Sequence, residues 1–167
     1  MLSKTKKLIM AALMASLACV ATMIIKIPSP LNGYINLGDC IVLLCGWVLA
    51  PGYGFAAAAI GSALADVLSG YAIYAPATFV IKGVMALVAF AIFKLLSKKI
   101  KKFPSRIIGG ILAEIIMILG YFVFESFLYG FAPSLVNIPA NAIQGAAGLI
   151  VGLLLVKVFE RAGIGVE

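Results

Sequence analysis

Six long apolar segments, separated by short polar breaks, occupy most of this 167-residue sequence. The apolar segments cover residues 8–26, 38–50, 54–71, 77–96, 107–130 and 138–158. Proline, glycine or clustered lysine separates each segment from the next. Hydrophobic residues make up 64% of the chain and charged residues 11%, whereas soluble domains carry about 25% charged residues. The pattern therefore predicts an all-α membrane protein with six transmembrane helices, forming one integral membrane domain over residues 1–167.

Lysine and arginine lie almost entirely in the breaks that would face one side of the membrane. They precede the first segment, fill the break between the fourth and fifth, and end the sixth (Lys4, Lys6 and Lys7; Lys94, Lys98, Lys99, Lys101, Lys102 and Arg106; Lys157 and Arg161). The opposite loops contain neither residue, although Lys26 stands at the edge of one. Cytoplasmic loops are rich in these residues, so both termini are expected inside. The net charge of +7 then needs no nucleic acid as a partner.

Polar side chains inside the apolar segments are concentrated towards the opposite, outer side. Ionisable groups at such depth are costly and mark functional sites. A channel needs polar residues along its whole length, whereas a closed-ended pocket needs them at one end only. We therefore predict a substrate-binding pocket that opens outward and is formed by Asn36, Asp39, Asp66, Tyr74, Thr78, Lys82, Glu125, Asn137, Asn141 and Gln144.

The same residues allow a structural interpretation. Asp66 and Lys82 could form an ion pair between two helices, and the amides could join helices by hydrogen bonds. Glu114 lies in the inner half of the fifth segment, where we expect a structural or coupling role. The longest outer connection, residues 27–37, is expected to be either a lid over the pocket or an ordinary connector.

Several classes of chemistry lack their usual residues. The chain contains no histidine, so a histidine base or metal ligand is excluded, and its three cysteines suit neither a disulfide framework nor a metal site. Phosphate-binding lysine loops, HExxH and GxSxG are also absent. We expect no catalytic residue, no metal and no cofactor in this chain, and therefore not an enzyme.

Several short motifs resemble the substrate-binding S components of energy-coupling factor (ECF) vitamin transporters. The resemblance covers nearly the whole chain. It rests on Ala11-x-x-x-Ala15, Tyr34-Ile35-Asn36-Leu37-Gly38-Asp39, Ala65-Asp66-Val67-Leu68-Ser69-Gly70-Tyr71, Pro76-Ala77-Thr78-Phe79-Val80-Ile81-Lys82-Gly83 and Pro139-Ala140-Asn141-Ala142-Ile143-Gln144-Gly145. Within the family, these motifs are most similar to the hydroxymethylpyrimidine and pyridoxine group.

The resemblance implies a mechanism in a prokaryotic plasma membrane. The chain would bind a vitamin from outside and then associate with a transmembrane coupling protein and two cytoplasmic ATPases. ATP and Mg would bind to those ATPases, and Ala11 and Ala15 would contact the coupling protein. The S component would then topple in the bilayer and release the vitamin inside. Riboflavin and thiamin are the alternative vitamins.

Two functions of other classes stay open at this stage. A stand-alone small-solute transporter would take up its substrate without partners, although no inverted repeat is evident in the sequence. A structural membrane-assembly protein would bind no ligand and would tolerate Asp66→Asn and Lys82→Met.

Overall fold

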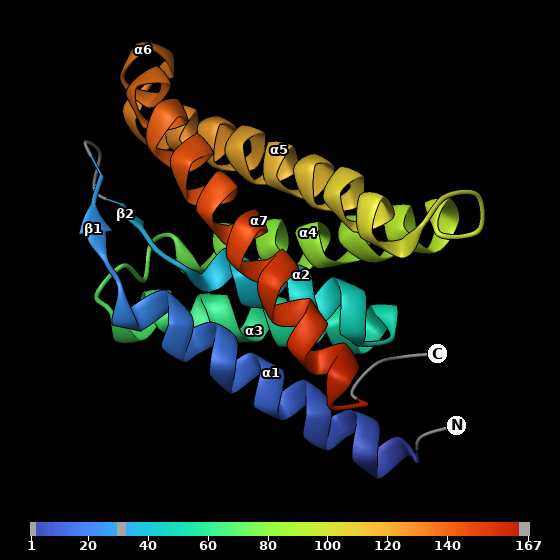
Figure 1. Cartoon of the computed structure of the whole chain (residues 1–167). Helices are drawn as coiled ribbons and strands as arrows, with labels where there is room; N and C mark the ends of the chain where they lie inside the picture. The colour runs from blue at the N-terminus through green and yellow to red at the C-terminus, as the bar shows by residue number, and fades with distance from the viewer. Residues whose placement is uncertain (1–2, 30–32, 164–167) are drawn as a thin grey trace.

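The computed structural model describes residues 3–29 and 33–163, and that part of the chain contains six long helices (Figure 1). They are α1 (Lys4–Ile24), α2 (Gly38–Val48), α3 (Pro51–Leu68), α4 (Ala75–Leu96), α5 (Lys102–Tyr129) and α7 (Ile138–Arg161). Each corresponds to one predicted segment, so the six-helix prediction is confirmed. Proline lies in the first turn of α3, α4 and α7, where its fixed φ and missing N–H suit a helix start.

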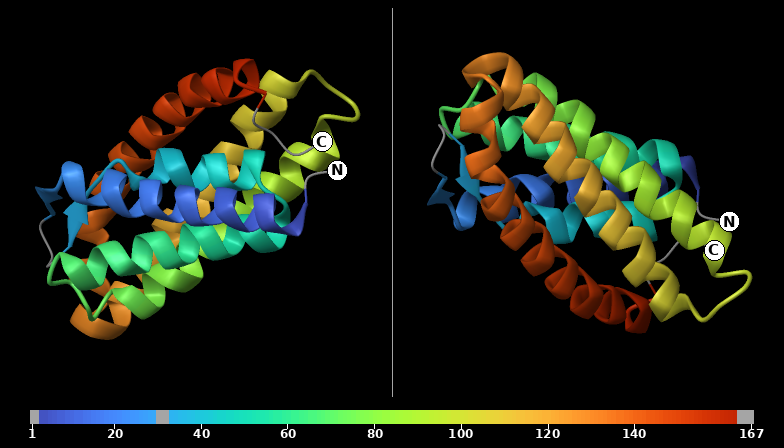
Figure 2. Two further views of the ribbon diagram at one scale, coloured as in Figure 1. Left: turned by 90° about the horizontal axis from the view of Figure 1, so that it is seen from below. Right: turned by 90° about the horizontal axis from the view of Figure 1, so that it is seen from above.

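Two outer connections contain structure that the sequence pattern did not predict. Strands β1 (Ile27–Pro28) and β2 (Tyr34–Ile35) pair antiparallel, with Ile27 opposite Ile35. The chain after α5 forms the short helix α6 (Phe131–Ser134) and the 3₁₀ turn η1 (Leu135–Asn137) before α7 begins. Both connections lie at the end of the bundle opposite the two termini (Figures 1 and 2).

Helix α2 is the central element of the bundle. All eleven of its residues are buried, and α1, α3, α4 and α7 pack around it. At about 1.5 Å per residue, it covers roughly half of a hydrocarbon core about 30 Å thick. It begins just after the β1–β2 hairpin, which occupies the connection between α1 and α2.

The outside of the bundle is apolar, as a surface in contact with lipid requires. Large hydrophobic side chains such as Leu13, Phe127 and Ile143 are exposed on it. By length and composition, α1, α4, α5 and the stretch Phe131–Arg161 are able to cross a membrane; α2 is an apolar helix too short to do so. The termini and the lysine-rich α4–α5 connection share one end (Figure 2), which the positive-inside rule predicts to be the cytoplasmic end.

Candidate functional site

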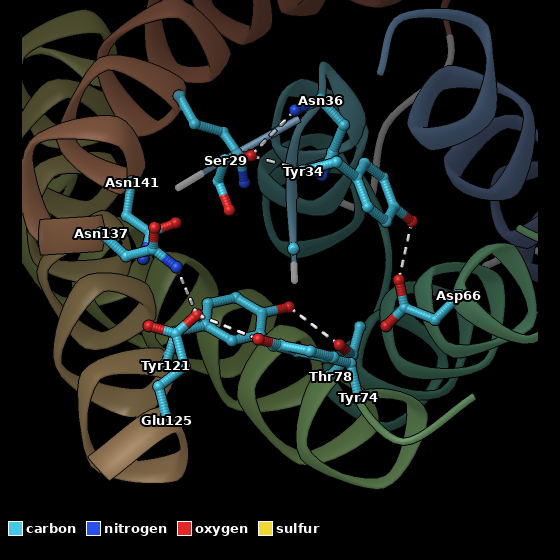
Figure 3. A pocket seen from close by; sticks show the side chains of 12 residues that line it. Ser29, Tyr34, Asn36, Asp66, Tyr74, Thr78, Tyr121, Glu125, Asn137 and Asn141 are labelled. Atoms are coloured by element: carbon cyan, nitrogen blue, oxygen red, sulfur yellow. Dashed lines mark hydrogen bonds between the residues drawn. The ribbon is translucent and has the colours of Figure 1, made fainter. Parts of the chain in front are cut away.

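A polar cavity lies at the hairpin end of the bundle, between β2, η1 and the outer parts of α3, α4, α5 and α7 (Figure 3). It has a volume of about 400 Å³ including its open mouth. The lining residues are Ser29, Gly33, Tyr34, Asn36, Asp66, Tyr74, Thr78, Tyr121, Glu125, Asn137, Asn141 and Gln144.

Eight of the ten predicted pocket residues line this cavity. They come from five separate segments of the chain and are Asn36, Asp66, Tyr74, Thr78, Glu125, Asn137, Asn141 and Gln144. Their convergence follows from depth, because each lies within about two turns of the outer end of its helix or just before it. Their role in binding a ligand stays a prediction.

The other two predicted residues, Asp39 and Lys82, form a buried ion pair that is not part of the lining. Asp39 lies in the first turn of α2, where the helix dipole favours a negative charge. Gln144 Nε2 donates to Asp39 Oδ2 at 2.7 Å, and Gln144 Oε1 accepts from the backbone N–H of Asn36 at 2.9 Å. Gln144 therefore connects the lining of the cavity to the ion pair.

The structure corrects the suggested ion pair between Asp66 and Lys82. Lys82 on α4 instead binds Asp39 on α2, and Asp66 on α3 accepts a hydrogen bond from Tyr34 Oη at 2.7 Å. The physical reason is the central position of α2, which brings Asp39 against the inward face of α4.

Two buried carboxylates lie on different walls of the cavity (Figure 3). Glu125 Oε1 accepts hydrogen bonds from Asn137 Nδ2 at 2.8 Å and from Tyr74 Oη at 3.4 Å. The second oxygen of each carboxylate, Asp66 Oδ2 and Glu125 Oε2, has no hydrogen-bond partner among the described residues. The cavity therefore offers acceptor atoms to a ligand on two sides.

Tyrosine hydroxyls supply most of the donors around these carboxylates. Burial, and then the neighbouring Asp66, raise the pKa of Tyr34 above its ordinary value, so its hydroxyl stays protonated and donates. Tyr121 Oη lies 2.9 Å from Thr78 Oγ1, and the Tyr74 and Tyr121 ring centroids are 6.5 Å apart. The rings provide an apolar wall for a flat ligand.

Sequence reasoning did not assign four of the lining residues, Ser29, Gly33, Tyr34 and Tyr121. Aromatic residues, including these two tyrosines, are frequent in the outer halves of the predicted segments, where the sequence allows either an interface belt or a pocket wall. For Tyr34, the available signal was its position two residues before the polar lining residue Asn36. Tyr121 is one helical turn before Glu125 on α5, so the two share a face.

Glu114 lies deeper in the bundle and does not line the cavity. It is 5% exposed, and neither carboxylate oxygen has a hydrogen-bond partner among the described residues. Gly145 of α7 lies against it, since a Cβ added there would be 2.9 Å from Glu114 Oε2. The expectation of a structural or coupling role is not tested by this arrangement.

The small residues of α1 pack within the bundle. Ala11 is buried, and a Cβ added to Gly61 of α3 would lie 2.3 Å from the carbonyl oxygen of Ala15. Ala15 is half-buried and also borders a shallow surface groove with Ser16, Cys19, Val20 and Leu64. The predicted contact with a coupling protein therefore stays a prediction, and Ala11 is covered in this structure.

The described residues contain no group of three or more histidine, cysteine, aspartate or glutamate side chains able to hold a metal ion.

An apolar helical bundle whose polar cavity opens at one end defines a membrane-embedded solute-binding protein. The family model described as ECF-type riboflavin transporter, S component, matches residues 2–161, and the chain belongs to this family. ECF S components are substrate-binding subunits of transporters rather than enzymes.

Two further proteins are similar to this chain over most of its length. The solved structure of the S component of a bacterial ECF transporter superposes with a TM-score of 0.76 at 28% identity, over 95% of this chain and 98% of that chain. An uncharacterized protein in the gap 3′ region of Pyrococcus woesei is 34% identical over 134 residues, which are 80% of this chain and 87% of that protein. The family match and the solved structure confirm the resemblance to ECF S components that the sequence motifs indicated, and the similarity to the hydroxymethylpyrimidine and pyridoxine group stays a prediction.

Proposed function

We propose that this S component captures a small heteroaromatic vitamin or precursor, pyridoxine or hydroxymethylpyrimidine, from outside the cell. The observation that carries the proposal is the cavity, which opens at the hairpin end and is lined by carboxylates, amides and tyrosines. Gln144 in its lining donates a hydrogen bond to Asp39, whose ion pair with Lys82 lies outside the lining. Such a cavity suits capture from one side, because a continuous polar path across the bilayer would be needed for conduction.

Riboflavin is the second candidate ligand, and the description of the matching family favours it. Its three-ring system is larger than a pyridine or pyrimidine ring. The free space of about 400 Å³ includes open solvent, and the enclosed part of the cavity is only about 40 Å³, which favours a single substituted ring over a three-ring system. Thiamin, which carries one pyrimidine ring, is intermediate in size between these ligands.

Delivery inward would require partners, namely a transmembrane coupling protein and two cytoplasmic ATPases that bind ATP and Mg. The groove at Ala15 on α1 supports this proposal, because small residues on a lipid-facing helix allow close helix contact. The proposed location is the plasma membrane of a prokaryotic cell.

Native mass spectrometry of the detergent-purified chain, combined with thermal-shift measurements, tests the proposal. The panel is pyridoxine, hydroxymethylpyrimidine, thiamin and riboflavin. One vitamin should bind at one-to-one ratio and raise the unfolding temperature. Substrate uptake by the chain alone, abolished by a protonophore, would instead support a stand-alone transporter, and an empty protein unresponsive to the panel would contradict vitamin binding.

A further inference from the structure

The charges around the cavity do not balance. Asp66 and Glu125 are 5% and 2% exposed, and no lysine or arginine is among the lining residues. One oxygen of each carboxylate lacks a hydrogen-bond donor in the described part of the chain. A carboxylate buried at membrane depth without a cation or donors is costly, so a compensating group is expected.

The cations of the protein are engaged or lie elsewhere. Lys82 is paired with Asp39, and Arg106 is paired with Glu160 near the opposite end of the bundle. Lys26, at the hairpin end, donates to Ser69 at 3.2 Å, one helical turn beyond Asp66. Lys26 is not among the lining residues, and within the described ion pairs no cation is paired with Glu125 on α5.

The geometry of Glu125 leaves one acceptor atom available in a defined direction. Asn137 and Tyr74 both donate to Oε1, which fixes the carboxylate from the α7 and α4 sides (Figure 3). Oε2 is buried and has no donor among the described residues. An N–H group with a positive charge would supply both missing components, the donor and the charge, in one charge-assisted hydrogen bond.

We infer that the ligand is a cationic heteroaromatic molecule, a ring with a protonated amine or ring nitrogen, whose positive charge lies against Glu125 Oε2. Asp66, on the α3 wall, accepts a second donor from the ligand. This inference rests on the proposed function and refines its substrate class from a polar ring to a cationic one.

Two pairs of probes differ only in the group that carries the charge. Pyridoxamine and pyridoxine differ by aminomethyl against hydroxymethyl, and so do the 5-aminomethyl and 5-hydroxymethyl forms of 4-amino-2-methylpyrimidine. The aminomethyl group is protonated near neutral pH. Isothermal titration of the full chain in detergent should show tighter binding of the cationic member of at least one pair, by about tenfold.

The Glu125→Gln variant tests which carboxylate is responsible. The amide keeps the shape and removes the charge, so the ratio of the dissociation constants of the neutral and cationic members should fall to near one, whatever the affinity of either member alone. Glu114→Gln is the matched control, because Glu114 is another buried carboxylate with unpartnered oxygens that lies outside the lining. It should retain the preference.

The outcomes separate this inference from the proposed function. Equal or tighter binding of the neutral members, or a preference that Glu125→Gln leaves unchanged, overturns the inference. Binding of riboflavin but of neither pair also overturns it, while the vitamin-binding function stands. Binding of no member of the panel contradicts both. If Glu125→Gln does not fold, the comparison of paired probes on the unmodified chain still decides the sign of the preference.

Discussion

At the residue scale, Asp39 and Lys82 neutralise each other where neither side chain meets water. Their side chains are 0% and 4% exposed, and Gln144 supplies a further hydrogen bond to the aspartate. Removing one member of a buried ion pair strands the other charge, whereas replacing both removes the cost of burial as well. Replacing both residues together, and comparing the result with each single replacement, therefore tests whether the two charges stabilise each other.

We expect Lys82→Met to lower the free energy of unfolding by about 3–5 kcal/mol, because Asp39 is left buried without its cation. The double variant Asp39→Asn with Lys82→Met should recover most of this loss. Thermal unfolding of the purified proteins in one detergent gives the comparison. A double variant as unstable as the sum of its two single variants would show that the residues do not interact energetically.

The identity of this ion pair illustrates what the sequence could predict at the residue scale. The topology placed Asp39, Asp66 and Lys82 towards the outer side, and in the structure Asp66 lines the cavity while Asp39 and Lys82 form an ion pair outside the lining. Depth does not determine which residues face each other around the bundle axis. That depends on the central position of α2, which the hydropathy pattern does not encode.

At the scale of elements, α1 and α3 approach so closely that a glycine is required between them. A Cβ at Gly61 would lie 2.3 Å from the Ala15 carbonyl oxygen and 2.9 Å from Ala18 Cβ. We expect Gly61→Ala to lower stability by about 1–3 kcal/mol by forcing the helices apart. Thermal unfolding measures the change.

Gly52, in the first turn of the same helix, provides the matched control. No atom would lie within 4 Å of a Cβ at that position. Gly52→Ala should therefore leave stability unchanged or raise it by up to about 1 kcal/mol, since alanine restricts the unfolded chain. Equal destabilisation by both variants would show that the close approach of α1 and α3 is not the cause.

The β1–β2 hairpin is the second element with a testable role. Tyr34 joins it to α3 through the 2.7 Å hydrogen bond to Asp66. Tyr34→Phe should speed dissociation of the vitamin identified by the binding panel about tenfold, because a hydrogen bond to a charged group is lost. Stopped-flow fluorescence or surface plasmon resonance measures the rate.

Tyr71→Phe is the control for this variant, because the Tyr71 ring contacts the Tyr34 ring at a centroid distance of 4.7 Å and would keep that contact. The vitamin should dissociate from Tyr71→Phe at the same rate as from the unmodified chain. An unchanged rate in Tyr34→Phe would mean that this bond does not hold the hairpin over the ligand, and the connector interpretation of residues 27–37 would then be preferred.

The elements differ in how well the sequence predicted them. Helix limits were close to the predicted ones because Pro51, Pro76 and Pro139 mark helix starts chemically. The β1–β2 pair and α6 were missed, since two-residue strands and a four-residue helix leave no periodic pattern. Eight of the ten predicted pocket residues reached the lining because they share depth.

At the scale of the whole molecule, the orientation in the membrane decides from which side the cavity is filled. We expect Ala132→Cys, at the hairpin end, to react with a membrane-impermeant maleimide on intact cells. Lys99→Cys, in the α4–α5 connection, should react only after permeabilisation. Both side chains are exposed, and replacement of the three native cysteines by serine removes background labelling. The reverse pattern would place the cavity mouth in the cytoplasm.

The burial of α2 has a consequence for biogenesis. A segment of eleven residues is too short for the insertion machinery to release into lipid as an independent span. We expect it to enter the bilayer together with α1 and α3, which pack against it. Substitutions in α2 should consequently be limited by side-chain volume rather than by lipophilicity, and truncation after Val48 should leave a chain with one stable span.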